Sequence, residues 1–432
     1  MAGLLVGPAA PVRDGGRVRI LHATDTYGPT VGGIEVLVRA LAESQAAAGH
    51  EVTVLTRTPG PADVGGPVEV CRDPRAFATL LACTDVVHGH VSAYSPLALR
   101  SVESAAKADV AAVATVHSVW GSAWPLFRAC AAVRGWPDLP IQWAAVSDVA
   151  AGPVRRAMVG RDVLVIPNAV DTAYWTPALP ARVSRHVTLV SVMRMSHRKR
   201  PLELVAALHR MQGLVPAGTA VTALLVGDGP LLGRVRRRIR RLGMADWVQA
   251  PGDLSHPQLR DVYRRADVYV APATLESFGL AALEARAAGL AVVARHGTGV
   301  TEFVTHGVEG LLAGDDRELA EHLARLCTDD LLRQRMVRHN HHVPPPLDWS
   351  QVSERNTAAY VLAGAVDSRP ATPTASPSTP PSTPLPAGGS WARTDQSEIS
   401  DPCAVGWSSV PGGLDRQAPT PLPLSRTAVR PS

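Results

Sequence analysis

The sequence predicts an α/β protein made of two successive domains, each built around a doubly wound parallel sheet. Two observations carry this prediction: 46% of the 432 residues are apolar while only 4% are aromatic, and short apolar strands alternate with amphipathic helical segments. The apolar content excludes a wholly disordered or fibrous chain. The length favours two or three domains, at about 150 residues each.

The first strand–helix–strand unit lies between residues 18 and 56. Residues 18–24 form an apolar strand, and from Ile34 the apolar residues recur with the i, i+3, i+4, i+7 spacing of an amphipathic helix. Gly49 is placed to end this helix, and residues 51–56 form the next strand. Such a unit predicts parallel pairing of its two strands.

The same alternation continues through both domains. Further strands are expected at 85–88, 111–115, 144–147, 163–166, 187–192, 223–226, 268–271 and 291–294. Helices of the second series are expected near 198–210, 230–242, 256–265 and 279–288. Because ligands of doubly wound sheets bind at the carboxyl ends of the strands, we expect the two domains to face a central cleft that holds a ligand.

Changes in composition predict the domain boundaries. We expect a flexible N-terminus at 1–17, a first domain at 18–177, a short linker at 177–180, a second domain at 181–343 and a Pro/Ser/Thr-rich tail at 365–432. The tail is expected to be disordered, because it cannot bury enough apolar surface to offset its ordering entropy.

Other features of the sequence favour a soluble protein without cysteine chemistry. The five cysteines lie far apart and form no C-x-x-C motif, which predicts neither a zinc site nor a disulfide framework. No apolar run reaches the roughly 18 residues of a membrane span, and the first 17 residues lack the basic start of a secretory signal. We therefore expect a cytoplasmic protein, with peripheral contact at the inner face of the membrane as an option.

The net charge of +5 is concentrated locally. Six of the eight positions from 234 to 241 are arginine. A basic helix of this kind grips the phosphates of nucleic acid or an anionic membrane, or it is simply a solvated helix face. The solvated face is the more common case, and a nucleic-acid partner is not expected.

The stretch 272–289 carries most of the chemical information. It follows an expected strand and opens a helix, with Glu276 in the connecting loop and Glu284 inside the helix. The free amides and the dipole of a first helical turn attract an anion, and Gly279 lets a phosphate approach closely. Because the two carboxylates would repel a phosphate, we expect them to accept hydrogen bonds from sugar hydroxyls.

The two acids stand in the sequence E-S-F-G-L-A-A-L-E-A-R-A-A-G, which resembles the E-x7-E motif of the retaining glycosyltransferases of family 4, whose fold is GT-B. Further segments resemble that family in the same chain order, at 28–35, 114–117, 166–171, 192–199 and 225–230. The resemblance covers residues 18–362. It departs from the family at Ala169 and Arg200, where glycine is usual.

The resemblance implies two Rossmann-like domains and an enzyme that transfers a sugar from a nucleoside-diphosphate sugar, with retention and without a metal or cofactor. It implies that Glu284 binds the ribose, Glu276 the sugar hydroxyls, and Arg194 with Lys199 the diphosphate. Two cations at a strand end suit a leaving diphosphate, whose developing charge needs electrostatic stabilisation. Because Arg200 replaces the usual glycine, Arg198 or Arg200 could share that role.

The first domain is implied to bind the acceptor and to place His117 near the reacting carbon. Further donor contacts are implied at Gly33, Gly227, Phe278, Gly279 and Leu280. Gly227 fits a plain strand-to-helix turn equally well. The last helix, at 347–362, is implied to cross back to the first domain. By this interpretation, Glu284→Ala weakens donor binding far more than Asp316→Ala.

Several alternatives stay open from the sequence. The acceptor is a glycan, a lipid or a small metabolite. Four tryptophans that follow His117, at positions 120, 124, 136 and 143, favour a sugar-stacking platform or a lipid contact slightly over a core. The run His339–His342 is interpreted as surface rather than as a metal site. An inactive sugar-nucleotide-binding protein and a GT-B sugar-nucleotide epimerase are the competing functions.

Overall fold

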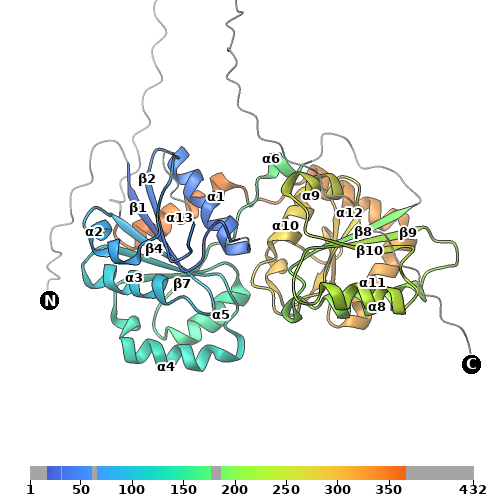
Figure 1. The fold of residues 1–432 in the computed structure, drawn as a ribbon, viewed down its shortest axis with the longest axis horizontal. Helices are drawn as coiled ribbons and strands as arrows, with labels where there is room; N and C mark the ends of the chain where they lie inside the picture. The colour runs from blue at the N-terminus through green and yellow to red at the C-terminus, as the bar shows by residue number, and fades with distance from the viewer. Residues whose placement is uncertain (1–16, 31, 61–65, 177–185, 366–432) are drawn as a thin grey trace, which may run out of the picture. The chain divides into compact units, whose positions relative to one another are not determined.

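The computed structural model describes residues 17–30, 32–60, 66–176 and 186–365. Within these ranges the chain forms two parallel sheets, one in each half, and helices cover both faces of each sheet (Figure 1). The predicted fold class is therefore confirmed. The expected N-terminal segment up to residue 16, the 177–180 linker and the Pro/Ser/Thr-rich tail from residue 366 lie outside the described residues.

The first half is built on a seven-stranded parallel sheet with the order β3-β2-β1-β4-β5-β6-β7. Its strands are β1 (Arg19–Thr24), β2 (Glu51–Thr56), β3 (Glu69–Cys71), β4 (Val86–Val91), β5 (Ala111–Val116), β6 (Ile141–Ala145) and β7 (Val163–Val165). Its helices are α1 (Gly33–Ala47), α2 (Phe77–Leu81), α3 (Pro96–Lys107), α4 (Trp124–Arg134), α5 (Asp148–Ala157) and α6 (Thr172–Trp175). The strand order reverses at the β1–β4 pair, which is the point where doubly wound sheets bind ligands.

The second half is built on a six-stranded parallel sheet with the order β10-β9-β8-β11-β12-β13. Its strands are β8 (Val187–Val192), β9 (Val221–Val226), β10 (Val248–Gly252), β11 (Val268–Ala271), β12 (Ala291–Arg295) and β13 (Gly310–Ala313). Its helices are α7 (Pro201–Gln212), α8 (Leu232–Arg241), α9 (His256–Tyr263), α10 (Leu280–Ala287), α11 (Asp316–Thr328) and α12 (Asp330–His342). Here the order reverses at the β8–β11 pair.

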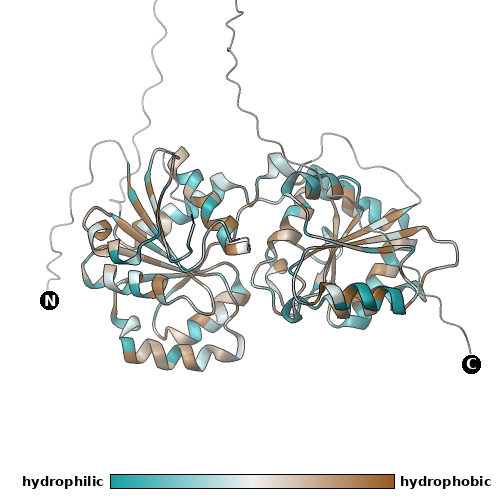
Figure 2. Ribbon diagram, in the orientation of Figure 1, coloured by the Kyte–Doolittle hydropathy of each residue, from teal (hydrophilic) through white to brown (hydrophobic). Residues whose placement is uncertain are grey.

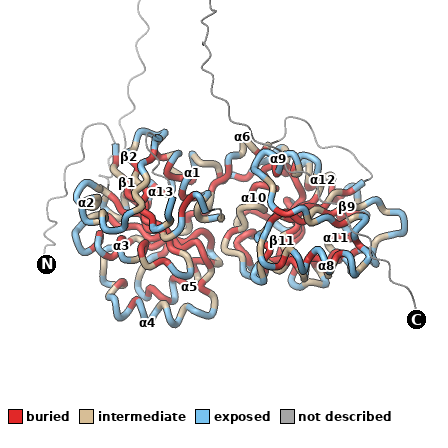
Figure 3. The backbone as a smooth tube through the Cα atoms, in the orientation of Figure 1, coloured by how far each residue is buried: buried red, intermediate tan, exposed pale blue. Residues whose placement is uncertain are grey.

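The cores lie between the sheets and their helices. Strand β5, with the sequence A-A-V-A-T-V, is buried at every position, as expected for a parallel strand covered on both faces. Figure 2 shows the strands as the most hydrophobic elements, and Figure 3 shows the same segments as buried. In the first half, α3 and α5 pack on one face of the sheet, and α1 packs on the other.

Helix α13 (Trp349–Leu362) returns to the first half after α12. It packs against α1 and β5, and its buried residues Val352, Ala359 and Tyr360 join the apolar cluster on the α1 face of the first sheet. This face is thus covered by one helix from the start of the described chain and one from its end.

Three strands were not anticipated from the sequence, namely β3, β10 and β13. All three are edge strands, and β3 has only three residues. The signals of β3 and β10 are weak, since β3 is very short and β10 contains Gln249 and Pro251. Strand β13 is apolar and fully buried, but its four residues are too short to show a periodicity. Strand β6 was expected at 144–147 and lies at Ile141–Ala145, because Ile141 and Trp143 supply its buried side chains.

Candidate functional site

The predicted donor residues of the second half follow the two strands at its switch point. Arg194 and Lys199 lie after β8, and Glu276 lies after the neighbouring strand β11. The carboxyl ends of parallel strands meet at one sheet edge, so these residues from distant parts of the sequence converge there. The Lys199 ammonium forms a direct ion pair with the Glu276 carboxylate.

The charges of this group differ in how they are compensated. Lys199 is about one-third exposed and Glu276 is mostly buried, and each neutralises the other. Arg194 is exposed, and among the described residues its side chain has no hydrogen-bond or ion-pair partner. Among the described residues this edge of the sheet therefore presents an unpaired cation, Arg194, beside a compensated pair, which suits an incoming anion.

The turn between Glu276 and α10 is tightly packed. Gly279 caps α10 in the left-handed region (φ 93°), and a Cβ on it would lie 2.8 Å from Val300 Cγ2. Phe278 is buried against Phe303, with ring centroids 5.3 Å apart. The first amides of α10, including that of Leu280, have no intrahelical partners, so this fixed turn holds a group of donors in place.

Glu284 lies one turn inside α10 and is only 9% exposed. Burial raises the pKa of its carboxyl to about 8. The nearest ionisable partner in the described chain is His256 Nε2, at 4.0 Å, and burial lowers the pKa of that ring, so it is neutral at pH 7. A buried carboxyl without a close cation accepts donors readily, and a ribose diol would supply two hydroxyl donors.

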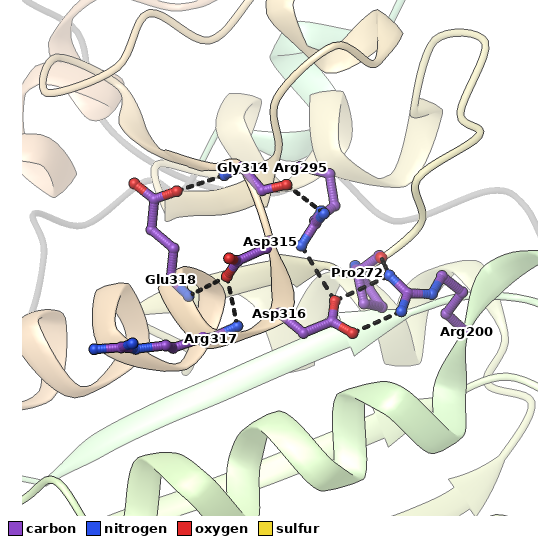
Figure 4. Close-up of polar contacts among 8 residues, drawn as sticks. All are labelled: Arg200, Pro272, Arg295, Gly314, Asp315, Asp316, Arg317 and Glu318. Atoms are coloured by element: carbon purple, nitrogen blue, oxygen red, sulfur yellow. Dashed lines mark hydrogen bonds and ion pairs between the residues drawn. The ribbon is translucent and has the colours of Figure 1, made fainter.

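Arg200 occupies the position where the family usually has glycine, and its backbone is left-handed (φ 58°, ψ 46°). That conformation explains the usual glycine, because a Cβ is unfavourable there. The Arg200 guanidinium forms two hydrogen bonds to Asp316, at 3.0 and 2.6 Å, and Arg295 approaches the same carboxylate at 3.1 Å (Figure 4). Asp316 thus anchors the segment that carries Lys199.

These contacts change two expectations from the sequence. The guanidinium of Arg200 is held by Asp316, so Arg198 is the only one of the two flanking arginines left to share a diphosphate. Asp316 is not an idle surface carboxylate, and it is a poor control for donor-binding variants. Exposed Glu321 on α11, paired with Arg317, replaces it in that use.

Gly227 lies at the end of β9 with φ 122°, and a Cβ there would collide with the carbonyl oxygen of Met193. Gly229 has φ 146°, and a Cβ there would lie 2.7 Å from the carbonyl oxygen of Met195. Both glycines let the loop after β9 lie directly against the backbone on either side of Arg194. This close backbone packing is sufficient reason for glycine at position 227.

In the first half, Gly33 and His117 follow β1 and β5. Gly33 is the first residue of α1, and a Cβ on it would meet nothing within 4 Å, so the helix start is open to a ligand. His117 is only 8% exposed, and burial lowers the pKa of its ring to about 4, so the ring is neutral at pH 7. Its Nε2 lies 3.0 Å from His90 Nδ1.

The tryptophan interpretation was wrong for three of its four members. Trp120, Trp136 and Trp143 are at most 4% exposed and belong to the core of the first half. Trp136 donates its ring N–H to the buried Glu103, where it helps to join α3 to the segment after α4. Only Trp124 is partly exposed, so these side chains form neither a lipid patch nor a stacking platform.

A buried polar group in the first half was missed from the sequence. His22, His88 and His90 lie within the sheet, and their ring nitrogens are within 4.8 Å of one another. Gln45 of α1 and Tyr360 of α13 hydrogen-bond to them. The available signal was His88-Gly89-His90, two imidazoles on one face of a strand that is otherwise apolar.

The arginine-rich segment forms α8, whose buried residues are Val235 and Ile239. Most of its arginines are exposed, and Figure 2 shows the helix as strongly hydrophilic. Arg236 donates to two backbone carbonyls of β10. No helix among the described residues is long and apolar enough to cross a membrane.

Two family models match the chain in succession. The model of Glycosyltransferase Family 4 matches residues 31–174, and that of Glycosyl transferases group 1 matches residues 181–342. Glycogen synthase of Mycobacterium tuberculosis is 27% identical over 401 residues, which cover 80% of this chain and 95% of that protein. Phosphatidyl-myo-inositol mannosyltransferase of Mycobacterium leprae is 28% identical over 354 residues, covering 76% and 92%.

Solved structures show the same fold. The crystal structure of Anabaena HepE in complex with UDP and glucose has a TM-score of 0.64 at 19% identity, covering 80% of this chain and all of that one. Sucrose-phosphate synthase of Thermosynechococcus elongatus has a TM-score of 0.61 at 21% identity, covering 80% and 98%. With both halves matched in order, the chain belongs to the family 4-like glycosyltransferases of the GT-B fold.

Proposed function

We propose that this protein transfers a sugar from a nucleoside-diphosphate sugar to an acceptor with retention of the anomeric configuration and without a metal ion. The observation that carries the proposal is the convergence of Lys199 and Glu276 at the switch point of the second sheet, directly before the fixed N-terminus of α10. The HepE structure with UDP-glucose, at 19% identity, supports a donor of this chemical class.

Each residue has a role that follows from its surroundings. Glu284 accepts hydrogen bonds from the ribose hydroxyls, and the amides at Phe278 to Leu280 hold the sugar or the phosphate. Arg194 and Lys199 neutralise the charge that develops on the departing diphosphate. The Lys199–Glu276 pair opens when the donor binds, so that the ammonium turns to phosphate and the carboxylate to sugar hydroxyls.

The departing phosphate takes the proton of the acceptor hydroxyl on the same face of the sugar, which gives retention. From the first half, His117 contacts the donor sugar near its reacting carbon, and the open start of α1 at Gly33 lies near the phosphate. The curated relatives named above act, by their names, on a glucan and on an inositol lipid. Because these acceptors differ so much, the first experiments measure the donor side.

The test compares Glu284→Ala with Glu321→Ala by calorimetric titration with UDP-, GDP- and ADP-sugars. We expect one donor class to bind the wild type and Glu321→Ala equally. We expect Glu284→Ala to bind that donor about 10- to 100-fold more weakly, since a hydrogen bond to a charged group contributes about 1.5–3 kcal/mol. Equal binding by both variants would contradict the proposal.

The titration also reports protonation. The Glu284 pKa of about 8 means that most of this carboxyl is protonated at pH 7 in the free protein. If the ribose hydroxyls donate to a carboxylate, binding lowers this pKa and releases protons. We therefore expect proton release at pH 7 by the wild type and none by Glu284→Gln, and tighter binding as the pH rises towards 8.

Turnover separates the competing functions. Product formation that requires an acceptor, with the anomeric configuration read by NMR, supports retaining transfer. Conversion of the donor sugar without an acceptor indicates an epimerase, and binding without any turnover indicates an inactive binding protein. Full activity after treatment with EDTA is expected, and loss of activity that Mg²⁺ restores would contradict the metal-free reaction.

A further inference from the structure

One face of the first sheet carries a continuous row of polar side chains. His22 of β1, His88 and His90 of β4, Thr115 of β5 and His117 just beyond it are all less than 10% exposed. They share the face on which Ile20, Val86 and Val113 join the apolar cluster of α1 and α13, because residues two apart on a strand point the same way. Burying so many polar groups is unfavourable unless each one is hydrogen-bonded.

The hydrogen bonds form one unbroken chain. His117 Nε2 lies 3.0 Å from His90 Nδ1, and His90 Nε2 lies 2.9 Å from His22 Nδ1. His22 Nε2 lies 2.7 Å from Gln45 Oε1, and Gln45 Nε2 donates to the Tyr360 hydroxyl at 2.9 Å. The chain thus links a histidine at the end of β5 to helix α13.

A second branch leaves the Tyr360 hydroxyl, which lies 3.0 Å from His88 Nδ1, while His88 Nε2 lies 2.8 Å from Thr115 Oγ1. Burial lowers the pKa of all four histidine rings, so each ring is neutral at pH 7. A neutral imidazole has one donor and one acceptor nitrogen. The protons in the chain must therefore all be ordered in the same direction.

Gln45 sets that direction. Its Oε1 only accepts, so His22 carries its proton on Nε2 and accepts at Nδ1. His90 must then donate from Nε2 to His22 and accept at Nδ1, and His117 must donate from Nε2 to His90. Among the described residues nothing hydrogen-bonds Nδ1 of His117, so the ring keeps an acceptor lone pair for a ligand.

The same three strand histidines are a candidate metal site, since their ring nitrogens cluster within 4.8 Å. The geometry favours a proton relay instead. His22 Nδ1 and His90 Nε2 are 2.9 Å apart, which is the distance of an ordinary hydrogen bond with a proton between the two nitrogens. A metal would have to displace this proton, and two ligands 2.0–2.1 Å from a tetrahedral ion stand about 3.3 Å apart.

We propose that Gln45 and Tyr360 are positioning residues that act through His22 and His90 to fix the tautomer and ring orientation of His117, so that the docked helix α13 is required for a competent His117. This deepens the proposed function and rests on it for the role of His117. The neutral ring accepts a hydrogen bond at Nδ1 from a hydroxyl of the donor sugar, and the opposite tautomer would donate there instead.

The experiment uses the full chain labelled with ¹⁵N-histidine. Long-range ¹H–¹⁵N spectra distinguish a protonated from an unprotonated ring nitrogen, and His117→Gln assigns the His117 signals. In the wild type we expect His117 to be protonated on Nε2 only. In Gln45→Leu we expect a mixture of both tautomers, because the acceptor that orders the chain is lost. In Tyr360→Phe we expect the same mixture, because the hydroxyl that holds the Gln45 amide in its orientation is lost.

Tyr269→Phe is the matched control. It removes a buried tyrosine hydroxyl that donates to the Val192 carbonyl in the second half, at 3.1 Å, and we expect it to leave the His117 spectrum unchanged. In turnover assays, Gln45→Leu and Tyr360→Phe should lower kcat about 10-fold with little change in KM, as when an outer partner that orients a histidine is removed. The spectra do not depend on activity, so a chain that orders His117 but transfers no sugar contradicts only the proposed function.

Three results would overturn the relay. The first is a wild-type His117 protonated on Nδ1. The second is a His117 spectrum that stays unchanged in folded Gln45→Leu and Tyr360→Phe, with folding judged by circular dichroism. The third is uptake of one Zn²⁺ per chain with loss of the His22 and His90 ring N–H signals, which would make the cluster a metal site.

Discussion

The two sheets of this protein have the same doubly wound construction but place their chemically important side chains differently. In the second half, Arg194, Lys199 and Glu276 lie in the connections beyond the strand ends, with Lys199 at the end of a short 3-10 helix. In the first half, His22 and His90 lie within the strands and are buried. Charged loop residues keep contact with water and can exchange partners for a ligand. Strand residues cannot, so they must stay neutral and fully hydrogen-bonded.

The largest effect is expected when one of the cations beyond the strand ends is removed. We expect Lys199→Met to lower kcat about 10²- to 10³-fold, because the ammonium is proposed to stabilise the leaving diphosphate. The change also leaves Glu276 without its partner, so donor binding should be measured separately from turnover. Kinetics with saturating donor give the comparison.

Arg335→Met is the control for this variant. Arg335 is an exposed cation on α12, far along the chain from the switch point, and surface changes of this kind usually cost little. An equal loss of kcat in both variants would show that general positive charge, rather than the placement of Lys199, supports the reaction.

The placement of the proposed donor residues beside the strand ends was predictable because its signal is local. Glu276 and Glu284 stand eight positions apart beside a strand, a turn and a helix start, and each of these features is visible in a short window. The strands of the switch point, β8 and β11, were also found at their observed positions. The unusual residue at position 200 is visible in the sequence, whereas its left-handed backbone and its ion pair with Asp316 are visible only in the structure.

The buried relay was not predictable in the same way. It joins β1, β4, α1 and α13, so its hydrogen bonds connect residues up to 315 positions apart, as in the Gln45–Tyr360 contact. The prediction of exposed tryptophans was wrong for a related reason. A run of aromatic residues after a strand has the same appearance in sequence whether it faces solvent or the core, and only the structure shows Trp136 in the core with its ring N–H bonded to Glu103 of α3.

The pH dependence of stability tests whether the buried histidines of the first half stay neutral in the folded protein. The pKa values of His22 and His117 are about 4 in the fold, and those of His88 and His90 are also lowered, by burial in each case. Between pH 6.5 and 4 the unfolded chain therefore binds more protons than the folded one. Stability should be retained above pH 6.5 and lost as the pH falls towards 4.

The expected loss is several kcal/mol, at about 1.4 kcal/mol for each pKa unit of each group. Urea unfolding at pH 7.5 and pH 5 measures it. His22→Gln should reduce the difference between the free energies of unfolding measured at pH 7.5 and at pH 5. Val54→Ala, at the neighbouring position on β2, should lower stability by the same amount at both. If His22→Gln leaves the difference unchanged, the buried ring is not a source of the acid sensitivity.

The smallest expected effect concerns the loop in which Arg200 replaces glycine. Arg200→Ala loses the ion pairs to Asp316 and keeps a Cβ in a left-handed conformation. Arg200→Gly loses the same ion pairs but removes the Cβ, so it should be more stable than the alanine variant by about 1 kcal/mol. Thermal unfolding of the two variants measures this difference, which corresponds to roughly 2 °C in a chain of this size.

The comparison of these two variants separates backbone from charge. If glycine and alanine are equally destabilising, the Asp316 anchor alone holds the segment, and the strain at φ 58° costs nothing measurable. If glycine matches the wild type, the ion pairs only offset the strain that arginine introduces. In that case the usual family residue and the Arg200–Asp316 pair are two solutions to one requirement, a left-handed turn that keeps Lys199 within reach of Glu276.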